Sequence, residues 1–294
     1  MQSPLTRRIF LNIWERTTDM TIICSIAAAA AVIFLIYVFV LVRPGKKRPH
    51  DSVFDREYAH RGLHSDTVPE NSLSAFRLAA EKGYGIELDV QLSSDGEVYV
   101  FHDYTLVRMT GKDGLLSEKT AAQLEEIRLL SGGVVTDEKI PTLREVLDAV
   151  DGRVPILVEL KGESTNTSLC PKADAILSEY RGPWCVESFN PMLIGWFRQN
   201  HPEVYRGMLS TDVFREKKKS ILNFLIGAMA LNIAARPDFI AYNYKYPERL
   251  CVKLCTRFFS ANRFMWTART PDEYRFMKGQ GTLTIFEGFL PEDC

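Results

Sequence analysis

The hydrophobic pattern sets the N-terminal segment apart from the rest of the chain. Residues 20–42 read MTIICSIAAAAAVIFLIYVFVLV, a run of 23 residues without a charge. At about 1.5 Å per residue, such a helix spans the roughly 30 Å hydrocarbon layer of a bilayer. A cleavable signal peptide has a shorter apolar region, and Arg-Pro-Gly-Lys-Lys-Arg follows here instead of a small-x-small cleavage site. We therefore predict a permanent transmembrane helix at 20–42, with an N-terminal tail at 1–19 and a polar linker at 43–56.

From residue 57 onward, short apolar or β-branched runs alternate with segments of helical periodicity. The runs that predict strands are 58–61, 85–90, 98–101, 155–160, 185–189, 205–209, 239–242, 264–267 and 284–286. The segments that predict helices are 72–82, 120–130, 143–150, 171–180, 191–200, 220–235 and 271–278. This alternation is typical of βα units around a parallel sheet. The length of 57–294 suits one α/β domain, a (β/α)8 TIM-type barrel, with an open doubly wound sheet as the alternative.

One of the nine predicted strands has no place in an eight-stranded barrel. The link between Val90 and Val98 contains Ser-Asp-Gly and is too short for the crossover helix that parallel strands require. One unit therefore departs from strict alternation, and we expect one strand to lie outside the barrel.

The charge distribution differs between the two parts of the chain. The total is −1, from 36 basic and 37 acidic residues, which argues against a strongly basic nucleic-acid binder. Residues 1–50 carry a net +5 and residues 51–294 a net −6. Basic residues are denser after the apolar run than before it, which favours a single-pass membrane protein whose barrel domain is cytoplasmic. Five cysteines lie outside the apolar run, and this odd number suits reduced thiols.

Polar residues gather at the ends of four predicted strands. The groups are His60-Arg61-Gly62, Glu87-x-Asp89, His102-Asp103 and Glu159-x-Lys161. Side chains two positions apart on a strand share a face, and the carboxyl ends of barrel strands converge on one mouth, where barrel enzymes carry their active sites. We therefore expect these side chains to meet.

The residue types in these groups suit phosphate-ester chemistry. Glu87, Asp89 and Glu159 offer hard oxygen ligands for Mg²⁺ or Ca²⁺. His60 and His102 can supply a general acid and a general base.

Two cations complete the set. Arg61 and Lys161 are suited to the negative charge of a phosphoryl group. A metal, two proton carriers and two phosphate-binding cations together are the equipment for hydrolysing a phosphate ester.

The same residues carry a resemblance to a known family. Residues 59–111 read AHRGLHSDTVPENSLSAFRLAAEKGYGIELDVQLSSDGEVYVFHDYTLVRMTG, which resembles the signature of the glycerophosphodiester phosphodiesterase family. Weaker matches follow in PTLREVL, VELKG, ESFNP and WTARTPDEY. The resemblance implies a barrel enzyme that hydrolyses glycerophosphodiesters to glycerol phosphate and an alcohol. It also implies that the three carboxylates hold a divalent metal, the two histidines form the acid–base pair and the two cations contact phosphate.

Further residues match the family less firmly. Glu70 and Asp103 are expected to orient neighbours in the site, Asp103 acting on His102. Asn71 is expected to cap the helix that begins at Ser72, and Trp266 to wall the substrate or to belong to the core. Many relatives end the last strand with Thr-Asp, whereas this chain has Glu287 after Ile-Phe.

Two other functions remain open from the sequence. One is lysophospholipase D-like hydrolysis of lysophospholipid head groups at the membrane, and the other is a non-catalytic module that binds lipid or phosphate. The segment 217–235 starts with three lysines and continues apolar, so it is either an ordinary barrel helix or a second, interfacial contact with the bilayer.

Overall fold

The computed structural model describes residues 4–45, 52–162, 164–216 and 219–293. Eight parallel strands form a closed barrel: β1 (Tyr58–His60), β2 (Gly85–Leu92), β6 (Ile156–Leu160), β7 (Trp184–Ser188), β8 (Arg206–Ser210), β9 (Phe239–Asn243), β10 (Asn262–Ala268) and β11 (Leu283–Phe286). The barrel closes because β1 pairs with both β2 and β11. The predicted (β/α)8 barrel is therefore confirmed, and the open sheet is excluded.

The extra strand lies where the short link predicts it. Strand β3 (Val98–Val100) pairs antiparallel with the end of β2, and Val90 lies opposite Val100. Because β2 continues beyond the barrel wall to make this pair, the two strands form a short extension at the mouth.

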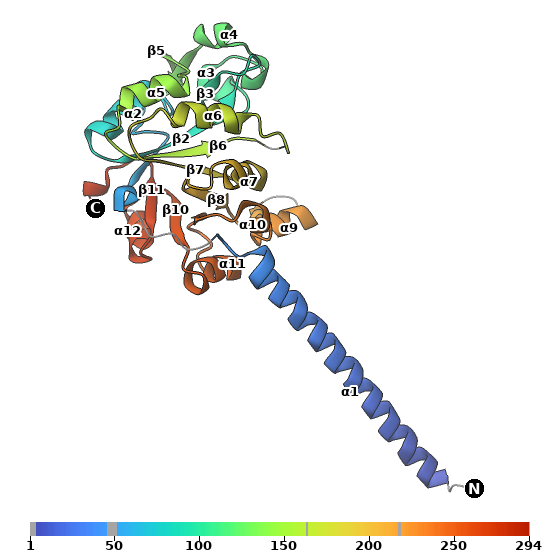
Figure 1. Ribbon diagram of the computed structural model, residues 1–294. Helices are drawn as coiled ribbons and strands as arrows, with labels where there is room; N and C mark the ends of the chain where they lie inside the picture. The colour runs from blue at the N-terminus through green and yellow to red at the C-terminus, as the bar shows by residue number, and fades with distance from the viewer. Residues whose placement is uncertain (1–3, 46–51, 163, 217–218, 294) are drawn as a thin grey trace.

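Helices surround the barrel (Figure 1). The longer ones are α2 (Leu73–Glu81), α5 (Leu143–Val150), α6 (Leu169–Leu177), α7 (Pro191–Asn200) and α12 (Pro271–Gly279). The shorter ones are α3 (Val107–Thr110), α4 (Ala121–Glu125), α8 (Val213–Glu216), α9 (Ile221–Gly227), α10 (Asn232–Ala235) and α11 (Leu250–Lys253). Single turns are η2 (Ser52–Phe54), η3 (Leu116–Glu118), η4 (Leu254–Phe258) and η5 (Pro291–Asp293).

The predicted cap of α2 is wrong. Ser72 is the N-cap residue, and its hydroxyl oxygen accepts a hydrogen bond from the Ala75 amide. Asn71 has a left-handed backbone (φ 55°) and donates its side-chain amide to Asp89 Oδ2 at 2.9 Å. Both residue types cap helices well, but this backbone conformation turns Asn71 toward the barrel mouth.

The helix predicted at 120–130 is wrong in its second half. Only α4 forms, and β4 (Arg128–Ser131) and β5 (Val134–Lys139) follow as a hairpin. Exposed and more buried side chains alternate along β4, which is the strand period. Gly132 and Gly133 both have positive φ, the conformation that a tight hairpin turn requires.

The single helix predicted at 220–235 is also wrong. The structure has α9 and α10 there, separated by a turn in which Met229 is left-handed (φ 53°). Gly227 ends α9, and a Cβ there would lie only 3.2 Å from the Val213 nitrogen and 3.4 Å from the Thr211 carbonyl oxygen. The backbone of α9 therefore packs closely against the segment after β8 at the point where the helix ends. Of the lysines at 217–219, Lys217 and Lys218 lie outside the described residues.

The barrel interior is a small apolar cluster that continues directly into polar residues at the mouth. Side chains two positions apart on a strand face the same way, so each interior residue is followed by an inward-facing residue one layer higher. The pairs are Tyr58 and His60, Leu157 and Glu159, Cys185 and Glu187, Ala241 and Asn243, and Phe264 and Trp266. The strand period therefore positions the polar residues of the mouth.

Gly207 on β8 is expected to tolerate no side chain. A Cβ at this position would overlap the buried ring of Phe239, and overpacking of this kind costs about 1–3 kcal/mol. We predict that Gly207→Ala lowers the melting temperature of the full-length protein, measured by tryptophan fluorescence. Gly279→Ala is the matched control, because its Cβ meets nothing within 4 Å and alanine favours the helix by up to about 1 kcal/mol. An unchanged melting temperature for Gly207→Ala would show that the barrel interior is loosely packed.

Helix α1 (Pro4–Ile36) projects from the barrel and ends in a π-helical turn, η1 (Tyr37–Leu41) (Figure 1). Asp19–Leu41 is long and apolar enough to cross a membrane, a property that signal sequences share. The end of this segment is bonded to the β8–β9 connection. Tyr37 donates to the Ala228 carbonyl at 2.9 Å, and the Asn232 side chain donates to the Val42 carbonyl at 2.8 Å.

Candidate active site

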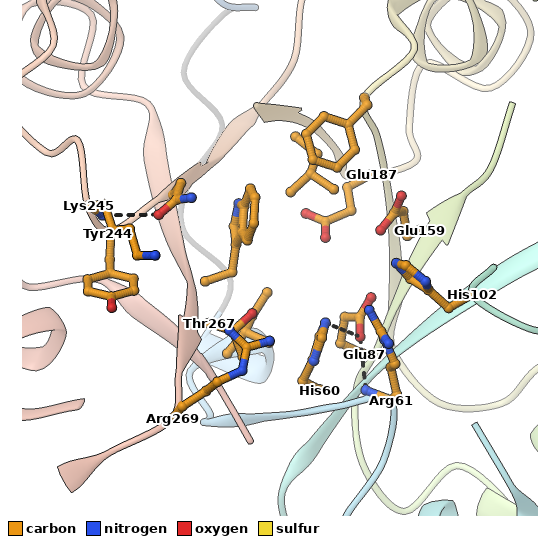
Figure 2. A pocket seen from close by; sticks show the side chains of 15 residues that line it. His60, Arg61, Glu87, His102, Glu159, Glu187, Tyr244, Lys245, Thr267 and Arg269 are labelled. Atoms are coloured by element: carbon orange, nitrogen blue, oxygen red, sulfur yellow. Dashed lines mark hydrogen bonds and ion pairs between the residues drawn. The ribbon is translucent and has the colours of Figure 1, made fainter. Parts of the chain in front are cut away.

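A cavity of about 160 Å³ lies at the carboxyl ends of the barrel strands. Residues from all eight barrel strands or the loops after them line it together with His102, and Figure 2 labels ten of the lining residues. His60, Arg61 and Glu87 lie on one side, and His102, Glu159 and Glu187 lie beside them facing the same space (Figure 2). The structure thus brings the predicted polar groups together.

Three of the predicted carboxylates form a compact buried group. Glu87 and Asp89 come from β2, and Glu159 lies directly opposite Asp89 on β6. One oxygen from each lies within 4.8 Å of the others. Burial and repulsion from Asp89 raise the pKa of Glu87 well above its usual range, and burial raises the pKa of Glu159 to about 7. Burial would also raise the pKa of Asp89, but Lys161 and Arg61 hold it well below its usual range.

A fourth buried carboxylate, Glu187 on β7, was missed by the sequence analysis. It pairs in register with Glu159 and is 1% exposed. Its Oε2 has no hydrogen-bond partner among the described residues, and burial raises its pKa well above the usual range. The strand period could have indicated Glu187. It lies two positions after the interior residue Cys185, just as Glu159 lies two positions after Leu157.

The donor set of the mouth fits a divalent cation. Four buried carboxylates lie close to only two partly buried cations, Arg61 and Lys161, among the described residues of this region. Carboxylates buried in this way are costly unless they bind positive charge. Hard oxygen ligands of this kind suit Mg²⁺ or Ca²⁺.

The two cations are held by the acidic residues around them. Arg61 has a left-handed backbone (φ 57°), and its amide donates to Glu87 Oε2 at 3.0 Å. Its guanidinium donates to Glu70 Oε1 at 2.7 Å, and Glu70 also accepts from Arg108 at 2.6 Å. Lys161 Nζ lies 2.8 Å from Asp89 and 2.7 Å from Glu159. These contacts fix both positive charges at the rim of the carboxylate group.

Each histidine has a carboxylate on its Nδ1. His60 Nδ1 lies 2.9 Å from Glu287 Oε2, and His102 Nδ1 lies 2.6 Å from Asp103 Oδ1. Such a partner fixes the tautomer and leaves Nε2 for other chemistry. Burial lowers the pKa of His60 to about 4, and it also lowers the pKa of His102. Glu287, for which the sequence predicts no role, therefore contacts the site through His60.

The other wall of the cavity is formed by β9, β10 and the loops that follow them. Trp266 lines it and meets the Phe189 ring edge-on at 5.8 Å. Tyr244, Lys245 and Arg269 also line this wall, and none of them is predicted as a site residue from the sequence. They come from loops, where strand periodicity gives no signal.

Comparison with known proteins identifies the group to which the chain belongs. A model of the glycerophosphoryl diester phosphodiesterase family matches residues 60–287. The chain belongs to this family. Family membership places it among the phosphoric diester hydrolases, and the match runs from His60 at the end of β1 to Glu287 after β11.

Relatives of this family match along the whole barrel. YhdW of Bacillus subtilis is 26% identical over 247 residues, which cover 80% of this chain and 96% of YhdW. The glycerophosphodiester phosphodiesterase structure from Thermotoga maritima is 30% identical, with a TM-score of 0.58 over 82% of this chain and 96% of that one. A phosphodiesterase from Oleispira antarctica, solved in complex with the product sn-glycerol-3-phosphate, is 24% identical, with a TM-score of 0.66 over 79% and 92% of the two chains.

Proposed function

We propose that this protein is a membrane-anchored enzyme that hydrolyses glycerophosphodiesters to glycerol phosphate and an alcohol, with a divalent cation and two histidines. The observation that carries the proposal is the group of buried carboxylates at the barrel mouth, with His60 and His102 facing the same cavity. The product bound in the Oleispira structure, sn-glycerol-3-phosphate, supports glycerol phosphate as the product here.

The cation would be held by Glu87, Asp89 and Glu159, with Glu187 close enough to share its charge. When bound, Mg²⁺ or Ca²⁺ supplies positive charge that offsets the charge of a phosphodiester. Arg61 and Lys161 lie at the same rim and bind the phosphoryl oxygens. These oxygens would replace some of the carboxylate oxygens with which the two cations now pair. Fixed cations at this place stabilise the additional charge of the transition state.

The two imidazoles carry the protons. One histidine takes a proton from the attacking oxygen at its Nε2, and the other gives a proton from its Nε2 to the leaving alcohol. Glu287 and Asp103 hold Nδ1 of the two rings and stabilise whichever ring becomes positive. Trp266 walls the bound substrate on the opposite side.

The domain organisation and orientation belong to the same proposal. The 57–294 barrel acts as one catalytic domain, the span at 20–42 anchors it, and the basic residues after the span favour a cytoplasmic barrel. Burial of Val38 and Val42 supports retention of the span, because cleavage would remove Val42 from the main apolar cluster.

Product analysis tests the proposal. Full-length protein in nanodiscs is incubated with glycerophosphocholine and either Mg²⁺ or Ca²⁺, and the products are identified by mass spectrometry. We expect glycerol phosphate and choline in equal amounts. Release of phosphocholine instead, or no turnover with either metal, would contradict the proposal.

A further inference from the structure

A groove of about 880 Å³ opens from the catalytic cavity. The two spaces share His102, Glu159 and Phe189 as lining residues. Polar residues such as Lys161, Thr165 and Asn190 also line the groove, but most of its exposed surface is apolar. The apolar part includes Met192, Leu222, Ile226, Leu231 and Ala234. Its volume lies within the range of about 300–1,000 Å³ that is usual for ligand clefts. A deacylated glycerophosphodiester is polar throughout and has no group that such a wall would bind.

One wall of the groove comes from the β8–β9 connection, which carries α9 and α10. Leu222 on α9 is 59% exposed, and Met192 on α7 is 43% exposed. Apolar side chains that are this exposed beside a binding cavity mark a surface that contacts an apolar partner.

The same connection holds the end of the apolar span. Tyr37 is bonded to Ala228, Asn232 to Val42, and Arg236 Nη1 to the Arg43 carbonyl at 2.8 Å. In Figure 1, α9 lies close to the end of α1 that meets the barrel. The groove therefore joins the catalytic cavity to the part of the barrel that lies nearest the bilayer.

We propose that this groove binds the single acyl chain of a lysophospholipid, so that the enzyme cleaves head groups from such lipids at the membrane surface. This inference rests on the proposed function and names its substrate class. Arg61 and Lys161 bind the phosphodiester at the polar end, beside the carboxylates that would hold the cation, and the acyl chain lies along α7 and α9. The oxygen of water bonds to phosphorus, the bond from phosphorus to the head-group oxygen breaks, and that oxygen takes a proton. The acyl ester bond stays intact.

The test compares two substrates that differ in the acyl chain. Full-length protein in nanodiscs is assayed with glycerophosphocholine and with hexanoyl-lysophosphatidylcholine, which is soluble enough to reach the site from water. We expect kcat/KM to be about tenfold or more higher for the acylated substrate, since burial of two methylene groups already gives that factor. Leu222→Asp and Met192→Asp should remove most of this preference and leave turnover of glycerophosphocholine within about twofold, because a charge in the groove opposes only the chain.

Ile221→Asp is the matched control. Ile221 neighbours Leu222 and is 82% exposed, but it does not line the groove. Its replacement should leave the preference unchanged. Hydrolysis of glycerophosphocholine without any preference for the acylated substrate would overturn the groove assignment alone. Equal losses in Ile221→Asp and Leu222→Asp would also overturn it and would indicate a general membrane contact. Failure to hydrolyse either substrate would overturn the proposed function itself.

Discussion

Replacing His102 with alanine is expected to lower kcat for glycerophosphocholine by about 10²- to 10⁴-fold, the usual contribution of a positioned general acid or base. His60→Ala should cause a loss of the same order. Both rings line the cavity, and each has a carboxylate on Nδ1 that leaves Nε2 for proton transfer. Steady-state kinetics measures the effect, and the melting temperature should change little, because neither ring belongs to the apolar clusters.

His201→Ala provides the matched control for these two variants. His201 lies at the end of α7, stacks on Trp196 and pairs with Asp174 at 3.2 Å, away from the cavity. Its loss should leave kcat unchanged. If either His60→Ala or His102→Ala turned over substrate at the wild-type rate, the acid–base pair would be wrongly assigned.

Removal of divalent cations is expected to abolish turnover by the wild-type enzyme, and addition of Mg²⁺ or Ca²⁺ should restore it. Glu159→Gln should raise the metal concentration for half-maximal activity by about 100-fold or more, because loss even of an outer-sphere partner costs 10- to 100-fold. The substitution preserves shape and removes one of three carboxyl groups whose oxygens lie within 4.8 Å of one another. Activity measured against free metal concentration gives both results.

Glu125→Gln serves as the control for the metal experiment. Glu125 ends α4 and pairs on the surface with Lys139, so its loss should not change the metal requirement. Full activity of the wild-type enzyme after complete removal of metal would exclude the proposed role of the carboxylates.

The strands were predictable because burial imposes a simple pattern on them. All nine predicted strands are present, since each is a short apolar run bounded by turns or helices. The hairpin of β4 and β5 was missed because it stands outside the barrel, where exposed residues such as Val134 and Val135 blur the alternation. The break between α9 and α10 was missed because it depends on a backbone contact of Gly227 with a distant segment.

Site residues on strands were also easier to predict than site residues on loops. His60, Glu87 and Glu159 were predictable from strand ends, where the period of two fixes the direction of each side chain. The same period of two directs Glu187 into the cavity. Its neighbours two positions away are not polar, so it did not form one of the polar pairs on which the prediction was based. Tyr244 and Arg269 enter the cavity from loops, whose course depends on packing that the local sequence does not contain.

The central claim is that one divalent cation is bound among the carboxylates at the barrel mouth. A crystal of the protein soaked in Mn²⁺ and measured at the manganese absorption edge tests it most directly. We expect one strong anomalous peak in contact with oxygens of Glu87, Asp89 and Glu159, and its loss in Glu159→Gln. A peak elsewhere, or none at this site at a Mn²⁺ concentration that supports full activity, would contradict it.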